Sequence, residues 1–281
     1  MFIFVGILTM QKNISYRSSD LLSKLALMGK EFFSSKEAIA LLPDGKKSAG
    51  IKLLYDMTKR GLLMRIKEDL YHRIPYEQNN ETYFPNWHLA AEAMVREKKY
   101  YIGFYSALAI HGLITQPSLV EQVITQEQIK PQHQQIKNVR FEFITMNEER
   151  FFGYTQKWID DFNKVNCSDL EKTFIDCLYI PSHAGGITEI AKAFYKSKDK
   201  LQPQRLLEYL EKFNTQAVNK RLGFMLEHLK LFPDVQKSIS EKISPSYTPI
   251  DPSLPIKGKH YSRWKIIDNF DFQIVCQSIN T

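Results

Sequence analysis

Apolar residues recur at helical spacing in three short segments near the N-terminus. Leucines three and four residues apart in residues 18–29 predict a first helix. Ser34 and Glu37 have the spacing of a capping box, so a short second helix is expected to begin there and to stop at the following proline. A third helix is predicted over residues 48–60, where Gly61 can end it. This order is typical of a helix-turn-helix motif.

The third predicted helix has two chemically different faces. At 100° per residue, one side gathers apolar positions and the opposite side gathers polar and basic ones. The apolar side consists of Gly50, Leu53, Leu54 and Met57, flanked by Ile51 and Thr58. The polar side consists of Ser48, Lys52, Tyr55 and Lys59. A solvated lysine face is also common on ordinary helices, so this face alone does not indicate a function.

Two short apolar segments follow, residues 62–66 and 70–74, with a charged turn between them. They predict a β-hairpin, and a hairpin directly after a third helix is the wing of a winged helix. We therefore predict an N-terminal extension over residues 1–17 and a winged helix-turn-helix domain over 18–75. Residues 76–99 are predicted to form a polar linker and a connecting helix.

The charge of the chain is concentrated in this region. Residues 46–73 hold eight Lys and Arg against three Asp and Glu, a net charge of +5, whereas the whole chain carries +7. Such an excess favours an anionic partner, and a helix fits the major groove of duplex DNA. The predicted DNA-binding residues are Lys46, Lys47, Ser48, Lys52, Tyr55, Lys59, Arg60, Arg65, Lys67, His72 and Arg73.

The remainder of the chain mixes strand and helix patterns. Residues 100–102, 120–125, 139–146 and 150–159 are rich in β-forming residues, whereas 168–180, 187–197, 204–213 and 217–232 have helical periodicity. The predicted fold class is therefore α+β, with the winged helix followed by a larger mixed α/β domain over 100–281. Val218, Leu222, Met225 and Leu229 form one apolar stripe, which predicts core packing.

Candidate catalytic groups are present, but their pattern is weak. Ser106, His111 and either Asp169 or Asp176 are the residue types of a serine hydrolase, yet no G-x-S-x-G motif accompanies them. We predict that the protein is not an enzyme and has no cofactor, and keep an enzyme fused to a DNA-binding module as a third hypothesis.

The segment around these aspartates has a structural explanation. Ser168 and Glu171 have capping-box spacing and predict a helix start, while Lys172 and Asp176 are placed to form a modest pair four residues apart.

Metal, disulfide and membrane roles find little support. Cys167, Cys177 and His183 lack the paired spacing of zinc ligands, so no metal is predicted. Three cysteines form no disulfide pattern, which favours a reducing compartment, and the expected location is the cytoplasm. The apolar start, residues 1–10, is too short to span a bilayer, so no membrane partner is expected.

Several motifs resemble the AbiEi antitoxins of type IV toxin-antitoxin and abortive-infection systems. In the first domain they are SSKEAIALLP, KRGLLMRI and DLYHRIP. In the second they are YYIGFYSALAIHGL, RFFGY, NCSDLEKTFIDCLYIPSHAGGI, KRLGFMLEHL and a late set of Pro252, Gly258, Arg263, Trp264 and Asn269. The wing turn departs from the family, because Glu68 and Asp69 replace its frequent glycine.

The resemblance implies an antitoxin that is also a transcriptional repressor of its own operon. Its winged helix is expected to bind operator DNA with inverted repeats. Its C-terminal domain is expected to neutralise an AbiEii-like toxin of the nucleotidyltransferase class, with direct contact left open. The alternative is a general winged-helix regulator whose second domain senses a ligand or mediates assembly.

Overall fold

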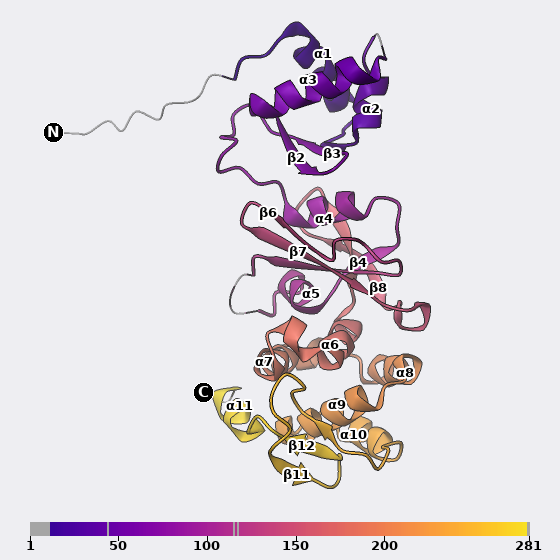
Figure 1. The fold of residues 1–281 in the computed structure, drawn as a ribbon. Coiled ribbons are helices and arrows are strands. Elements are labelled where there is room, and N and C mark those ends of the chain that lie inside the picture. The colour runs from indigo at the N-terminus through magenta and orange to yellow at the C-terminus, as the bar shows by residue number, and fades with distance from the viewer. Residues whose placement is uncertain (1–11, 44, 115, 117, 280–281) are drawn as a thin grey trace, which may run out of the picture. The chain divides into compact units, whose positions relative to one another are not determined.

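The chain divides into two compact units, residues 1–96 and 97–281. The computed structural model describes residues 12–43, 45–114, 116 and 118–279. Most of the predicted N-terminal extension lies outside the described residues. Both units contain helices and strands, so the fold is mixed α and β (Figure 1). Among the described residues, no helix is long and apolar enough to cross a membrane.

The first unit contains four helices and a small sheet among its described residues. The helices are α1 (Tyr16–Leu27), α2 (Ser35–Ala40), α3 (Lys47–Lys59) and α4 (Trp87–Val95). The strands are β1 (Phe32–Phe33), β2 (Leu63–Lys67) and β3 (Leu70–Arg73), in the order β1-β3-β2 with antiparallel pairing. The predicted helices and hairpin are thus present within one or two residues, while β1 was not predicted.

Local signals account for these boundaries. Ser34 and Glu37 form both hydrogen bonds of the predicted capping box at the start of α2. Gly61 adopts a φ of 68° after α3, a conformation that glycine accepts without strain. Gly50 allows α3 to approach α2 closely, because a Cβ there would lie 2.4 Å from a side-chain carbon of Ile39.

The core of the first unit is formed by helix faces packed on the hairpin. Its buried residues are Leu21, Leu25, Phe33, Ala38, Leu42, Leu54, Met57, Leu62 and Leu63. Helix α4 contacts β1 and β2, and Met94 in this helix accepts a hydrogen bond from Lys67. The predicted connecting helix is therefore part of the first unit and ends earlier than expected, at Val95.

The second unit begins with a six-stranded sheet in the order β6-β7-β5-β4-β9-β8. The strands are β4 (Tyr100–Ile102), β5 (Val120–Thr125), β6 (His133–Ile136), β7 (Val139–Thr145), β8 (Tyr154–Trp158) and β9 (Lys164–Ser168). The pairs β5·β7 and β4·β9 are parallel, and the others are antiparallel. In Figure 1 this sheet and a small sheet lie at opposite ends of the unit, with helices between them.

The helices between the two sheets supply most of the core. They are α5 (Phe104–Ile110), α6 (Leu170–Tyr179), α7 (Ile187–Ser197), α8 (Pro203–Phe213), α9 (Gln216–Leu229), α10 (Pro233–Ser240) and α11 (Phe272–Ile279). The small sheet is β10 (Thr248–Pro249), β12 (Ile266–Asp268) and β11 (Lys259–Tyr261). The predicted stripe on α9 is confirmed as core, since Val218, Leu222, Met225 and Leu229 are buried.

Candidate nucleic-acid interface

Helix α3 exposes a continuous ridge of side chains four residues apart. Lys47, Ile51, Tyr55 and Lys59 are all exposed and follow one another along the helix surface. Ser48 and Lys52 are exposed beside them. The opposite face is buried at Gly50, Leu54 and Met57. The amphipathic division predicted for this helix is therefore present, except that Ile51 lies on the exposed side.

The lysines at the start of α3 have no competing carboxylate in the described part of the chain. Lys46 is the N-cap residue, and its side chain makes no capping hydrogen bond. Lys46, Lys47 and Lys52 form no ion pair with any described residue. The Lys59 ammonium lies 4.6 Å from the centre of the Tyr55 ring. The start of α3 therefore exposes cationic groups, and its N-cap residue leaves the first backbone N–H groups without a side-chain cap.

Arg60 is placed differently from the lysines. Its Nε donates to the backbone carbonyl of Asp56 at 3.1 Å, and its guanidinium donates to Asn13 O at 3.3 Å and Ser18 Oγ at 2.9 Å. These bonds connect the end of α3 to the start of α1. Arg60 therefore has a structural role, whereas the sequence predicted it only as a DNA contact.

The prediction that His72 flanks DNA is wrong, because this side chain is only 2 % exposed. Its Nε2 lies 2.9 Å from Tyr83 Oη, and its ring packs against those of Phe32 and Tyr83. Burial, assisted by the charge of Arg73, lowers the pKa of His72 to about 4. The hairpin was predicted without a third strand, but β3 is central in the sheet and the His72 side chain lies on a covered face.

The other hairpin cations differ in accessibility. Arg65 is exposed on β2. Lys67 donates to the carbonyl of Met94 at 2.6 Å, and Arg73 is half-buried. Of the hairpin residues predicted to contact DNA, only Arg65 is therefore exposed.

The acidic hairpin turn has a role within the protein. Asp69 has a φ of 57° and accepts hydrogen bonds from the backbone N–H and hydroxyl of Ser35, the first residue of α2. Arg96 also donates to its carboxylate at 3.0 Å. Although burial opposes the shift, the Ser35 and Arg96 hydrogen bonds lower the pKa of Asp69. The Asp69 carboxylate at the turn therefore accepts hydrogen bonds at the N-terminus of helix α2.

In the second unit, the residue types of a hydrolase have separate structural partners. Ser106 Oγ donates to Val120 O at 3.1 Å and accepts from Gln122 N at 2.9 Å. His111 Nε2 lies 2.9 Å from Ser168 O. Asp176 lies with Lys172 in the interior. In the described chain these groups are thus held by different neighbours rather than aligned as a triad.

The predicted capping box at residues 168–171 is wrong. Asp169, not Ser168, is the N-cap of α6 and accepts a hydrogen bond from Lys172 N at 2.9 Å. The Ser168 hydroxyl bonds Thr173 Oγ1 at 2.6 Å, and Glu171 accepts from Gln202 N at 2.7 Å. Ser168 and Asp169 are adjacent and both can cap a helix, so the sequence alone did not fix the first residue of α6. In the structure Asp169 is the cap, and Ser168 and Glu171 have other hydrogen-bond partners.

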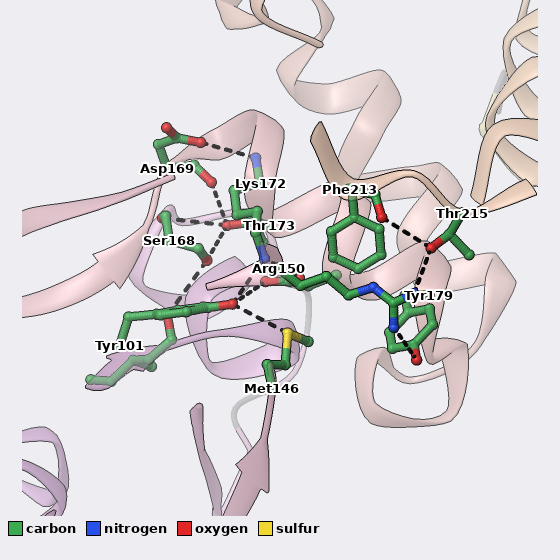
Figure 2. Close-up of polar contacts among 12 residues, drawn as sticks. Tyr101, Met146, Arg150, Ser168, Asp169, Lys172, Thr173, Tyr179, Phe213 and Thr215 are labelled. Carbon is green, nitrogen blue, oxygen red and sulfur yellow. Dashed lines mark hydrogen bonds and ion pairs between the residues drawn. The ribbon is translucent and has the colours of Figure 1, made fainter. Parts of the chain in front are cut away.

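The pair of Lys172 and Asp176 is fully buried, whereas only a modest pair was expected. Figure 2 shows Lys172 and Tyr101 among the polar contacts of this region. Lys172 Nζ contacts the Asp176 carboxylate and donates to Tyr101 Oη at 2.9 Å, and Tyr101 donates to Asp176 at 3.0 Å. The ammonium also lies 5.2 Å from the ring centres of Phe152 and Phe213. Burial lowers the pKa of Lys172 and raises that of Asp176, and each opposite charge counteracts the shift.

A polar cavity of about 530 Å³ opens in the second unit beside the sheet. Glu142 lies within it, 3.4 Å from both Arg140 Nε and His183 Nδ1. The remaining lining residues are Tyr105, Gln116, Ser118, Val120, Gln122, Ser182, Gly185, Glu189 and Lys192. These residues come from segments far apart in sequence, and no local pattern predicted the cavity.

The three candidate metal ligands are dispersed. Cys167 in β9 and Cys177 in α6 are fully buried, and burial raises the pKa of both thiols. His183 instead lines the polar cavity. Among the described residues, no group of three or more His, Cys, Asp or Glu side chains is arranged to hold a metal ion.

Comparisons with known proteins give a likeness of fold. No protein-family model matches the chain, and no curated protein matches it. The structure is similar to the crystal structure of the RV2827C protein from Mycobacterium tuberculosis, with a TM-score of 0.71 and 11 % sequence identity. The similarity covers 96 % of this chain and 96 % of that chain. The chain therefore shares its fold, across both units, with that mycobacterial protein.

Proposed function

We propose that the first unit is a winged helix-turn-helix module and that α3 binds in the major groove of duplex DNA. The observation that carries this proposal is the exposed cationic ridge of α3, whose lysines at the N-terminal end have no ion-pair partner among the described residues. An exposed helix of this kind fits the width of the major groove. The order of three helices followed by the β2–β3 hairpin supports the same interpretation.

Separate groups would bind the backbone and the bases. Lys46, Lys47 and Ser48 stand at the end of α3 where backbone N–H groups point outward, so they suit phosphate and base-edge contacts. Lys52 lies one turn further along the helix. Arg65 on β2 would contact phosphate beside the groove. Arg60, Lys67 and His72 are left out of this set, because their side chains serve the fold.

At the level of the whole protein, we propose an antitoxin and transcriptional autorepressor of a type IV toxin-antitoxin system, acting in the cytoplasm. The motif resemblance to AbiEi antitoxins supports this, and the division into two units suits a division of labour. The first unit would bind inverted repeats in operator DNA. The second would neutralise a nucleotidyltransferase-class toxin.

DNA binding can be tested by the salt dependence of duplex retention. The logarithm of the association constant should fall steeply and linearly with the logarithm of salt concentration, because bound lysines release counterions from phosphates. Lys47→Ala, Lys52→Ala and Lys59→Ala should each weaken binding and reduce the slope by about 1 for every lost phosphate contact. Their melting temperatures should barely change, since exposed substitutions alter stability by under about 0.5 kcal/mol.

Lys257→Ala is the matched control for these lysine variants. This lysine is exposed in the second unit, so its loss should leave both affinity and salt slope unchanged. A slope near zero for the unaltered chain would contradict the DNA-binding proposal. Equal losses of folding and binding in the α3 variants would instead assign these lysines to stability.

The polar cavity favours one alternative, a regulator whose second unit senses a small polar ligand. Screening polar metabolites by thermal shift would test it. A sensed ligand should raise the melting temperature and change operator affinity, and Arg140→Ala should abolish both effects. Growth rescue from a co-expressed toxin, unaffected by Arg140→Ala, would favour the antitoxin.

A further inference from the structure

Two large side chains on the cationic ridge are not explained by charge. Ile51 is 46 % exposed and Tyr55 is 57 % exposed, and they occupy the middle of the ridge between Lys47 and Lys59. Leu54 and Met57 are the α3 residues that are buried in the core of the first unit. Ile51 therefore presents much of an aliphatic surface to solvent at the centre of the face proposed to bind DNA.

The chemistry of the major groove offers one apolar group to such a side chain. Every base pair presents hydrogen-bond donors and acceptors there, but only thymine adds a C5-methyl group. A lysine, serine or tyrosine hydroxyl can satisfy polar base edges, whereas isoleucine cannot. An isoleucine buried in the groove is therefore stabilised by a methyl group and disfavoured beside an unpaired polar edge.

The geometry of the ridge is consistent with this placement. At about 1.5 Å per residue, Lys47 and Lys59 are roughly 18 Å apart along the axis, longer than the groove width of about 12 Å. Long side chains at the two ends can thus reach phosphates while the middle of the ridge faces the bases. The Lys59 ammonium lies 4.6 Å from the Tyr55 ring centre, and Ile51 is exposed one helical turn before Tyr55 on the same ridge.

We infer that Ile51 determines sequence specificity by packing against the C5-methyl group of a thymine in the operator, with the Tyr55 ring beside it. This inference rests on the proposed DNA-binding function and adds a base preference to it. It concerns one side chain and one methyl group, so it can be tested by removing either.

The experiment begins with selection of the preferred duplex from a random pool by the full chain. Each thymine of that duplex is then replaced by deoxyuridine, which lacks only the methyl group. At one or more positions the unaltered chain should lose about threefold to fivefold in affinity, the factor expected for one methyl-sized apolar contact. For Ile51→Ala, the same replacement should have no effect.

Two controls separate a base contact from a change of fold. Ile51→Ala should melt like the unaltered chain, because alanine is the better helix former at an exposed position. Leu27→Ala removes another exposed aliphatic side chain of the same unit, 88 % exposed on α1, and should keep the full sensitivity to deoxyuridine.

The possible outcomes distinguish this inference from the function on which it rests. Salt-dependent binding with no thymine coupled to Ile51, or a preferred duplex without thymine, would overturn the methyl contact and leave DNA binding intact. Failure to retain any duplex would overturn both. Coupling at Leu27 as strong as at Ile51 would also overturn the assignment.

Discussion

At the scale of single residues, the buried pair of Lys172 and Asp176 is the most sensitive point for stability. Both side chains are completely buried, and Tyr101 bonds to both of them. Lys172→Met would leave a carboxylate without its cation, which costs about 3–5 kcal/mol for a buried pair. We expect that loss in the free energy of unfolding of the second unit, measured by urea denaturation.

The double variant Lys172→Met with Asp176→Leu is the control for this prediction. It removes both charges together, so it should recover most of the lost stability. If the single and double variants are equally unstable, packing around the aromatic rings matters more than charge. Asp176→Ala would likewise leave the buried Lys172 without its counter-charge, so lost activity in this variant could come from lost stability. Ser106→Ala with His111→Ala is therefore the better test of catalysis.

His72 predicts a pH dependence for the first unit. Its pKa is about 4 in the folded chain against an ordinary 6.5, so the unfolded chain binds more protons between these values. The contribution is present above about pH 6.5 and is lost as pH falls towards 4, amounting to about 3 kcal/mol. Urea midpoints of the unaltered chain should fall across this window more than those of His72→Phe. If the urea midpoints of both proteins fall equally with pH, the pH dependence does not come from His72.

At the scale of elements, hydrophobic periodicity predicted the elements that have a long, regular apolar face. Helix α3 was found within one residue because its buried positions recur at helical spacing, and the hairpin was found within one residue from its two short apolar segments around a charged turn. The two-residue strand β1 has no such signal, yet it makes β3 a central strand and buries His72. Candidate residues on α3 were placed correctly as exposed, whereas the placement of His72 depends on β1 and that of Lys67 on α4.

The hairpin turn gives the element-scale prediction. Asp69 accepts from the backbone N–H of Ser35, a donor in the first turn of α2 that has no partner within its own helix. Asp69→Ala removes that acceptor and puts alanine at a positive φ, so it should lower the free energy of unfolding by about 1–2 kcal/mol.

Glu68→Ala is the neighbouring control, since Glu68 is exposed in the same turn and should be replaceable within about 0.5 kcal/mol. Chemical denaturation of both variants measures the difference. A Glu68→Ala loss as large as that of Asp69→Ala would mean that turn charge, rather than the bond to α2, stabilises the hairpin.

At the scale of the whole molecule, division of the chain into residues 1–96 and 97–281 makes the two proposed activities separable. Each unit has its own buried core, so each fragment should fold alone. Fragment 1–96 should bind the operator with the salt slope of the full chain and fail to rescue cells from the toxin. Fragment 97–281 should rescue growth without retaining the operator, which co-expression and duplex binding measure.

The full chain carrying Lys47→Ala, Lys52→Ala and Lys59→Ala provides the companion test. It should lose operator binding yet still rescue growth, because the substitutions lie on α3 and antitoxicity is proposed for the other unit. If rescue disappears together with DNA binding, the protein counters the toxin only through transcription. In that case the second unit would need a different role, and the polar cavity around Glu142 would become the place to look for it.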